Sequence, residues 1–175
     1  MHRFLLICPI YEPYAGGGGQ YFPYLRNSIL MQCGFYSIDV ITEYHSSKPT
    51  IERDPKGVIY RVLPKRDSKE NKTYIYSVLS FILTYAILSF FLIFLTFYRR
   101  YDTLQFTRYY RSFFYSFLRL LKNIRTIKIY CDLRATVGNF DVLNGLQFCD
   151  KILCNSFAVY TQATNIPKIK VNVFL

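Results

Sequence analysis

FLLICPIYEPYAGGGG, residues 4–19, is the stretch of this sequence that decides the fold. Its first part, Phe4–Cys8, is a continuous apolar run, the pattern of a strand that is buried on both faces of a parallel sheet. A loop with two prolines and the glycines Gly16–Gly19 follows, and apolar residues then recur at helical spacing from Tyr21 to Leu30. The order strand, glycine turn, helix predicts the opening of a βαβ unit.

The remainder of the 175 residues continues the same alternation, and the length suits one domain. Further strands are expected at 38–42, 57–64, 102–107, 126–131, 151–156 and 168–174, and further helices at 74–98, 108–125, 140–148 and 157–163. The polar residues 43–56 predict a loop. The sequence therefore predicts an α/β fold, a Rossmann-like parallel sheet with helices on both faces, whose ligand binds at the carboxyl ends of the strands.

Composition and charge narrow the class of protein. Hydrophobic residues make up 51% of the chain, which excludes disorder. Twenty-two basic against 11 acidic residues give a net charge of +11, so the surface should attract phosphates. The five widely spaced cysteines are expected to be reduced thiols of a cytoplasmic protein, without a metal-binding spacing.

The segment 74–98 contains no charged residue and ends at Arg99-Arg100. A buried core helix and a membrane-spanning helix both fit this pattern, but a single crossing would place the two halves of the sheet on opposite sides of the bilayer. We therefore favour a helix that lies in, or inserts shallowly into, the inner face of the cell membrane. Its expected membrane-associating residues are Phe81, Phe90, Phe91, Phe94, Arg99 and Arg100.

The segment 108–125 predicts an amphipathic helix. Arg108, Arg111, Arg119 and Lys122 share its basic side, and Tyr110, Phe113, Phe117, Leu120 and Leu121 share its apolar side. The basic side is either solvated or bound to anionic lipid headgroups. Nucleic acid is not an expected partner, because the aromatic residues are not interleaved with the basic ones.

The glycine turn is the most informative chemical feature of the sequence. Glycines let the backbone approach a phosphate, and the amino end of the following helix offers free N–H groups to it. The dinucleotide fingerprint G-x-G-x-x-G fails, because Tyr21 stands where its third glycine would follow Gly16 and Gly18. Glu43 still occupies the place of a ribose-binding acid, so a nucleotide-cofactor oxidoreductase remains an alternative.

Several motifs together resemble the amino-terminal domain of GT-B glycosyltransferases of the family-4 type. The resemblance rests on Pro9, Pro13, Gly16-Gly17, Leu25, Gly34 and Val40-Ile41-Thr42, and later on 57–64, Tyr101-Asp102, Asp132-Leu133-Arg134 and the segment 149–156 that ends in Ser156. It covers essentially the whole chain. The resemblance implies one half of a GT-B architecture, the half that binds the acceptor.

The resemblance also implies where ligands bind. Gly16, Gly17 and Gly18 would face the phosphates of a nucleotide-sugar, with Asp132, Arg134 and Ser156 as further cleft residues. Many family members carry a histidine before the acid of the fifth strand, where this chain has Cys131. The family's donor-binding domain would begin near the end of this sequence and is expected to be absent from it.

Two functions of different classes follow. The first is the acceptor-side half of a membrane-associated glycosyltransferase, inactive alone, which uses a nucleotide-sugar as co-substrate and no metal or other cofactor. Its acceptor would be lipid-linked or a polysaccharide of the cell envelope, and its partners would be anionic lipids and a separate donor-binding domain or subunit. The second is a non-catalytic module that binds the membrane surface.

Overall fold

The computed structural model describes residues 3–13, 17–33, 37–64, 74–107, 112–133, 145–154 and 156–164. The chain divides into two compact units. Unit 1 contains Cys8–Tyr101 together with the residues up to Arg3, and unit 2 contains Phe4–Ile7 and the residues from Asp102 onward. The predicted strand at 168–174 and the first residues of the predicted helix at 140–148 lie outside the described residues.

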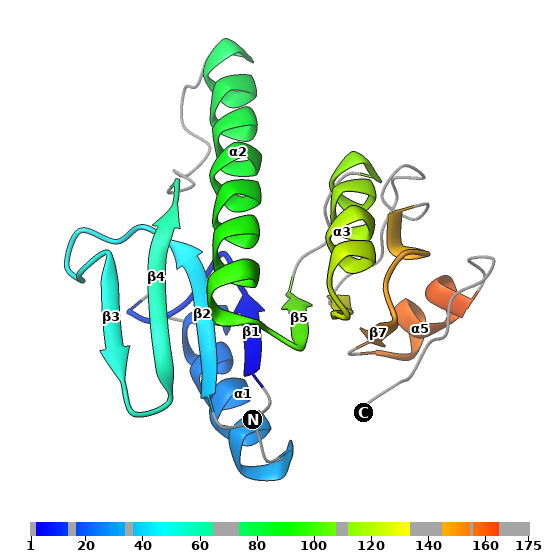
Figure 1. Ribbon diagram of the computed structural model, residues 1–175, viewed down its shortest axis with the longest axis horizontal. Coiled ribbons are helices and arrows are strands. Elements are labelled where there is room, and N and C mark those ends of the chain that lie inside the picture. The colour runs from blue at the N-terminus through cyan, green and yellow to red at the C-terminus, as the bar shows by residue number, and fades with distance from the viewer. Residues whose placement is uncertain are drawn as a thin grey trace. The chain divides into compact units, whose positions relative to one another are not determined.

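Unit 1 contains three strands in the order β3-β4-β2 (Figure 1). Strand β2 (Ser37–Glu43) pairs in parallel with β4 (Gly57–Leu63), and Val40 lies opposite Ile59. Strand β3 (Ile51–Asp54) pairs with β4 in the antiparallel direction. The prediction of a continuous loop at 43–56 was therefore wrong, because β3 is a short edge strand with polar, partly exposed side chains and no apolar run.

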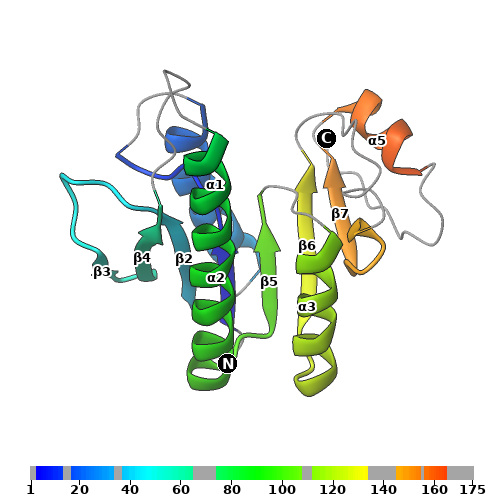
Figure 2. The ribbon, with the colours of Figure 1, turned by 90° about the horizontal axis from the view of Figure 1, so that it is seen from above.

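Two helices cover opposite faces of this part of the sheet (Figure 2). Helix α1 (Gly17–Cys33) packs on β2, and helix α2 (Tyr74–Arg99) packs on β4. The pleat explains the arrangement, since Tyr60 contacts Phe91 of α2 while the next residue, Arg61, points to the other face. Helix α1 begins at Gly17, four residues before Tyr21, so glycines form its first turn instead of preceding it.

Unit 2 contains four parallel strands in the order β1-β5-β6-β7. Their bounds are Arg3–Ile7, Thr103–Phe106, Lys128–Leu133 and Lys151–Cys154. Strand β6 lies two residues later than the predicted 126–131, because a bond from the Ile127 N–H to the Arg125 carbonyl (2.8 Å) keeps that segment in a turn. Helix α5 (Phe157–Thr164) packs on β7.

Helix α3 (Ser112–Ile124) is amphipathic, as predicted, but the side that it buries is displaced from the predicted apolar side. Its buried residues are Phe114, Tyr115, Leu118 and Leu121. Leu121 belongs to the predicted apolar side, whereas Phe113 and Leu120 of that side are exposed (54% and 58%). Apolar residues cover more than one side of this helix, and the contact of Phe114 with Phe106 of β5 selects which side faces the sheet.

The strand and helix order confirms the predicted fold class. Every strand predicted within the described residues is present, and all strands except β3 pair in parallel. The fold is a Rossmann-like α/β fold in which helices flank a mostly parallel sheet.

A buried polar cluster closes unit 1 at the start of β2 and β4. The carboxylate of Asp39 accepts hydrogen bonds from the Val58 N–H (2.8 Å) and from the Tyr101 hydroxyl. Burial, reinforced by Asp39, raises the pKa of Tyr101, so this tyrosine stays a neutral donor. The cluster ties the end of α2 to the strands, because the Arg3 guanidinium also donates to the Arg99 carbonyl (3.0 Å).

Gly57 is required at the start of β4. Its φ is +141°, and a Cβ there would lie 2.5 Å from the Ile38 carbonyl oxygen and 2.6 Å from the Asp39 carboxylate. We expect Gly57→Ala to lower the free energy of unfolding by about 2–4 kcal/mol, through backbone strain and disruption of the Asp39 cluster. Urea denaturation measures this change.

The matched control is Lys56→Ala, which changes the exposed neighbouring side chain in the same turn. It should alter the free energy of unfolding by less than about 0.5 kcal/mol. An equal loss of stability in the two variants would contradict the role assigned to Gly57.

Candidate functional site

The candidate site of unit 1 lies at the carboxyl ends of its parallel strands. Strands β2 and β4 end there at Glu43 and Leu63, and the Tyr44 N–H donates to the Leu63 carbonyl (2.8 Å). The segment Cys8–Pro13, which leads to the glycine turn, lies at the same edge, because the Cys8 N–H donates to the Ile41 carbonyl (3.0 Å). This is the edge at which open α/β sheets bind their ligands.

Hydrogen bonds hold the segment before the glycine turn in place. The Pro9 carbonyl accepts from the Glu43 N–H (3.2 Å) and from the Thr42 hydroxyl (3.1 Å). Three residues later, the Glu12 carbonyl accepts from the Arg61 guanidinium (3.4 Å). Both ends of the proline loop are therefore fixed to the sheet, which sets the direction in which the chain enters α1.

Arg61 is the central positioning residue of this edge. Its side chain is buried in β4, where it donates to the Glu52 carboxylate (2.7 Å) and to the Pro49 carbonyl (3.4 Å) in addition to Glu12. A guanidinium presents several N–H groups in one plane, so a single side chain can bind three loop segments. Sequence reasoning missed this residue, although a lone charge inside the apolar strand Gly57–Leu63 was a signal.

A second buried arginine fixes helix α1. Arg26 donates to the Ile38 carbonyl (2.9 Å) and, through both terminal nitrogens, to the Asp54 carboxylate (2.6 and 3.0 Å). Tyr11 is buried, and burial raises its pKa to about 12 even though Arg26 lowers it. Tyr11 is therefore uncharged at neutral pH. The bonds of Arg26 hold α1 against both β2 and β3.

The predicted phosphate-facing glycines lie partly within α1. Gly17 and Gly18 form the first turn of the helix, and Gly16 lies outside the described residues. The first N–H groups of a helix have no acceptor within it, and the helix dipole makes this end positive. The backbone of Gly17 and Gly18 is thus of the kind that binds phosphate, and that role stays a prediction.

The predicted cleft residues of unit 2 have different surroundings. Asp132 is buried near the end of β6, opposite Leu153 of β7. Ser156 caps α5, since its hydroxyl accepts from the Val159 N–H (3.4 Å) and its carbonyl from the Tyr160 N–H (3.0 Å). Arg134 lies outside the described residues. Ser156 therefore has a structural role, and its place in the cleft stays a prediction.

The cysteines whose side chains the structure describes are buried and form no disulfide bond with one another: Cys8, Cys131, Cys149 and Cys154. A hydrogen bond with Cys131 and burial raise the pKa of Cys149, and burial raises the pKa of Cys154. These two thiols are protonated at neutral pH, so they are poor nucleophiles. Among the described residues, no group of three or more His, Cys, Asp and Glu side chains is placed to hold a metal ion.

The predicted membrane-associating residues divide into two sets. Phe81, Phe90 and Phe94 are exposed, as is Arg100. Phe91 instead packs on Tyr60 with ring centroids 6.2 Å apart, and the charge of Arg99 lies near Tyr60 and Asp39 inside unit 1. The segment Val78–Arg99 of α2 is mostly exposed, since only 17% of its most hydrophobic 18 residues are buried. The alternative of a fully buried core helix therefore does not describe α2.

Removal of the Arg61 guanidinium should destabilise the edge at which β2 and β4 end. We expect Arg61→Met to lower the free energy of unfolding by about 2–3 kcal/mol, because Glu52 and the carbonyls of Pro49 and Glu12 lose their shared donor. Arg53→Met, which changes an exposed arginine in β3, is the control and should cost less than about 0.5 kcal/mol. Equal midpoints in urea for Arg61→Met and the unmodified protein would contradict this role.

Comparison with known proteins shows the fold. The sequence matches no protein-family profile and no curated protein. The structure is similar to that of a sucrose-phosphate synthase from Thermosynechococcus elongatus, with a TM-score of 0.58 and 9% sequence identity. The match covers 98% of this chain and 87% of that chain.

Two further solved structures agree. A UGT transferase from Siraitia grosvenorii in complex with UDP matches with a TM-score of 0.52 and 12% identity, and a glycosyltransferase from Rickettsia africae ESF-5 with 0.51 and 12%. Each match covers 98% of this chain but only 50% and 42% of those proteins. The chain therefore has the Rossmann-like fold found in part of these glycosyltransferases.

Proposed function

We propose that this chain is the acceptor-side half of a membrane-associated glycosyltransferase of the family-4 type. The observation that carries the proposal is the edge formed by β2, β4 and the anchored proline loop, which leads into the amino end of α1. The similarity of the fold to solved glycosyltransferases supports glycosyl transfer in general. The motifs around Gly17, Asp132 and Ser156 support the family-4 type.

In this proposal the chain supplies one wall of the reaction cleft. The amino end of α1, with Gly17 and Gly18, stabilises negative charge on the phosphates of a nucleotide-sugar as the sugar leaves. A second domain or subunit holds the nucleotide and the donor sugar and closes over the acceptor. The chain alone binds its acceptor but transfers no sugar, and the reaction needs no metal.

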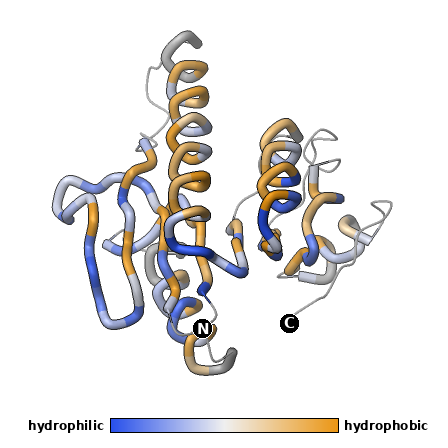
Figure 3. The backbone as a smooth tube through the Cα atoms, in the orientation of Figure 1, coloured by the Kyte–Doolittle hydropathy of each residue, from blue (hydrophilic) through white to orange (hydrophobic). Residues whose placement is uncertain are grey.

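The outer face of α2 is the proposed membrane contact. It consists of the exposed apolar residues Leu79, Leu83, Ala86, Phe90, Phe94 and Phe97. Leu79 is 60% exposed and Phe90 65%, and the hydrophobic colouring continues along the helix in Figure 3. Arg100 and the net charge of +11 favour anionic lipids. We place the protein on the cytoplasmic face of the cell membrane, with a lipid-linked or polysaccharide acceptor of the cell envelope.

The same outer face also favours a second candidate function, a non-catalytic module at the membrane surface. This alternative requires vesicle binding and predicts no interaction of the α1 amino end with phosphate. Phosphate binding at the amino end of α1 therefore favours the glycosyltransferase half over the non-catalytic module. Tight binding of NAD to the isolated chain would instead favour a nucleotide-cofactor oxidoreductase.

Membrane binding can be tested on the outer face. The double variant Phe90→Ser/Phe94→Ser should weaken binding to vesicles of 30% anionic lipid by about tenfold or more, because two exposed aromatic rings lose their contact with lipid. Phe113→Ser, an equally exposed ring in unit 2, is the control and should change binding less than twofold. Vesicle sedimentation that shows equal binding for all three proteins would contradict the membrane contact.

Phosphate binding can be tested with inorganic pyrophosphate on ¹⁵N-labelled protein. The amide signals of Gly17 and Gly18 should shift at millimolar pyrophosphate, because their N–H groups lie in the first turn of α1. The exposed residue Lys56 reports non-specific attraction and should shift less. Shifts confined to lysine and arginine residues would contradict the phosphate role of the glycines and favour the non-catalytic module.

A further inference from the structure

A group of arginines lies at the edge of unit 1 where β2 and β4 begin. Arg53 stands near the end of β3, Arg99 is the last residue of α2, and Arg100 follows it. Strand β4 is seven residues long, so at about 3.3 Å per residue this edge lies roughly 20 Å from the carboxyl ends of the strands. The arginines are therefore separate from the candidate site.

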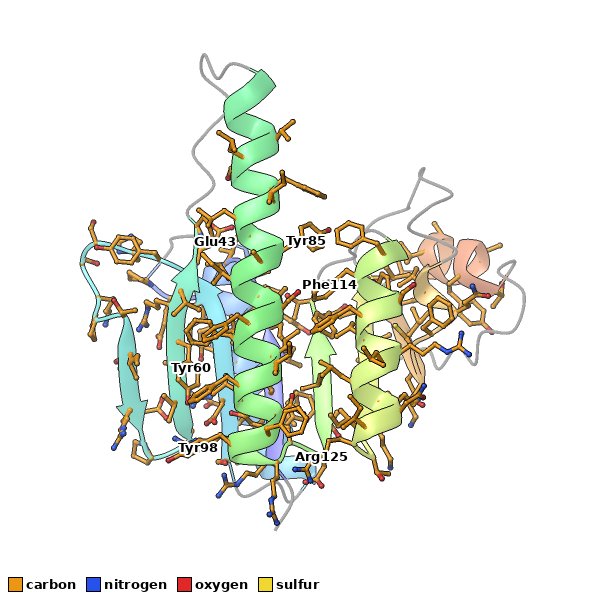
Figure 4. All side chains as sticks on the ribbon, turned by 45° about the horizontal axis from the view of Figure 1, so that its top comes forward. Glu43, Tyr60, Tyr85, Tyr98, Phe114 and Arg125 are labelled. Atoms are coloured by element: carbon orange, nitrogen blue, oxygen red, sulfur yellow. The ribbon has the colours of Figure 1, made fainter. Side chains whose placement is uncertain are left out.

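The pleat of β3 turns Arg53 toward α2. Ile51 lies opposite Tyr60 of β4, and Arg53, two residues after Ile51, shares its face of the sheet. Helix α2 covers that face, because the Tyr60 ring packs on Phe91 and lies between β4 and the helix (Figure 4). Arg53 is thus an exposed arginine on the same face as Tyr60.

The acidic residues of β3 are on the opposite face. Glu52 and Asp54 alternate with Arg53 along the strand, and they pair with the buried Arg61 (2.7 Å) and Arg26 (2.6 Å). Both carboxylates are therefore used to neutralise arginines beneath the sheet. The face that α2 covers receives the positive charge of β3 without its negative charges.

Arg99 reaches the same place from α2. The charges of Arg99 and of Arg53 both act on the Tyr60 hydroxyl, so both guanidinium groups lie near this oxygen. Burial raises the pKa of Tyr60, which therefore stays a neutral hydrogen-bond donor. The Nε of Arg99 is buried without a hydrogen-bond partner among the described residues. The bonds within unit 1 consequently leave the Arg99 guanidinium incompletely satisfied.

Charges at this edge do not balance. Arg53, Arg99 and Arg100 form no ion pair with any residue that the structure describes. The buried carboxylate of Asp39 supplies one negative charge near Tyr60, so three positive charges and one negative leave an excess of two. The carboxyl end of α2 contributes only about half a negative charge. An anion at this edge would remove the remaining excess.

The size of the excess favours a phosphate monoester. Such a group carries about 1.5 to 2 negative charges at pH 7 and three strong acceptor oxygens. A guanidinium binds two of these oxygens in one plane, and a hydroxyl can donate to the third. A carboxylate brings a single charge and would leave part of the excess in place.

We propose that Arg53, Arg99 and the Tyr60 hydroxyl bind a phosphate monoester at the edge where β2 and β4 begin. This site goes beyond the proposed function and does not depend on it, because it lies at the opposite edge of unit 1 from the candidate site. The same phosphate chemistry occurs in soluble compounds and in lipid headgroups. Glycerol 3-phosphate and phosphatidic acid separate these sources, since they carry one phosphate monoester without and with acyl chains.

Glycerol 3-phosphate is titrated into the full ¹⁵N-labelled chain, and the side-chain Nε–H signals of Arg53 and Arg99 are followed. Arg53→Met should weaken binding by about fivefold or more, because charge-assisted hydrogen bonds are lost. Arg119→Met removes an exposed arginine of unit 2 with the same change of net charge, and it should change binding less than twofold. Both side chains are exposed, and unfolding curves verify that both variants fold.

A second variant separates a built site from general attraction to positive charge. Tyr60→Phe keeps the net charge and the ring that packs on Phe91, but it removes the hydroxyl. Binding of glycerol 3-phosphate should weaken by about threefold, the effect of one lost hydrogen bond. Sedimentation with vesicles that contain phosphatidic acid repeats the comparison for the headgroup source.

Losses in Arg53→Met and Tyr60→Phe but not in Arg119→Met support the site, and the assay in which they occur identifies the source of the phosphate. Equal losses in Arg53→Met and Arg119→Met, or saturable binding in neither assay, would overturn it. Shifts confined to the amides of Gly17 and Gly18 would also overturn it, because the phosphate would then lie at the candidate site.

Discussion

Parallel pairing of β2 with β4 is the constraint on which the rest of the structure depends. The chain returns from the end of β2 to the start of β4 through β3, the edge strand that pairs with β4 in the antiparallel direction, so β2 and β4 end at the same edge of the sheet. In unit 1 this edge receives the ends of both strands, the proline loop and the start of α1. The candidate site is therefore defined by where these backbone segments meet and not by a side chain of unusual reactivity.

Two buried arginines convert that topology into a fixed geometry. Arg61 joins β4 to the loops that contain Glu12 and Pro49, and Arg26 joins α1 to β2 and β3. Burial of a guanidinium is costly, and the ion pairs of Arg26 with Asp54 and of Arg61 with Glu52 offset that cost, although the Nε of Arg61 is buried without a hydrogen-bond partner among the described residues. They hold backbone segments in place, which suits the proposed binding of phosphate by backbone N–H groups at the start of α1.

The sequence predicts those strands and helices whose own apolar pattern reflects how they are buried in the fold. The runs at Phe4–Cys8 and Gly57–Pro64 identify strands buried on both faces, and the first of these led directly to the fold class. Strand β3 could not be predicted, because its neighbour β4 supplies the pairing and its own side chains are polar. The buried side of α3 and the partners of Arg61 depend on tertiary contacts, which no local spacing encodes.

Helix α2 links the structure to its proposed role. Its residues Leu88, Leu92 and Leu95 are buried, while the outer face of the helix leaves apolar side chains exposed. Such a surface in contact with water is unfavourable, and burial against lipid removes that cost. In the proposed function, the helix would bring the edge that contains the start of α1 close to the membrane, where a lipid-linked acceptor would be found.

Transfer of sugar is the measurement that tests this account most directly. Membranes are incubated with labelled nucleotide-sugars and the chain, with and without a separately expressed donor-binding domain of a GT-B glycosyltransferase. The account predicts label in the lipid or polysaccharide fraction only when both parts are present. Label that appears with the donor-binding part alone, at the same rate as with both parts, would contradict the acceptor-side role of this chain.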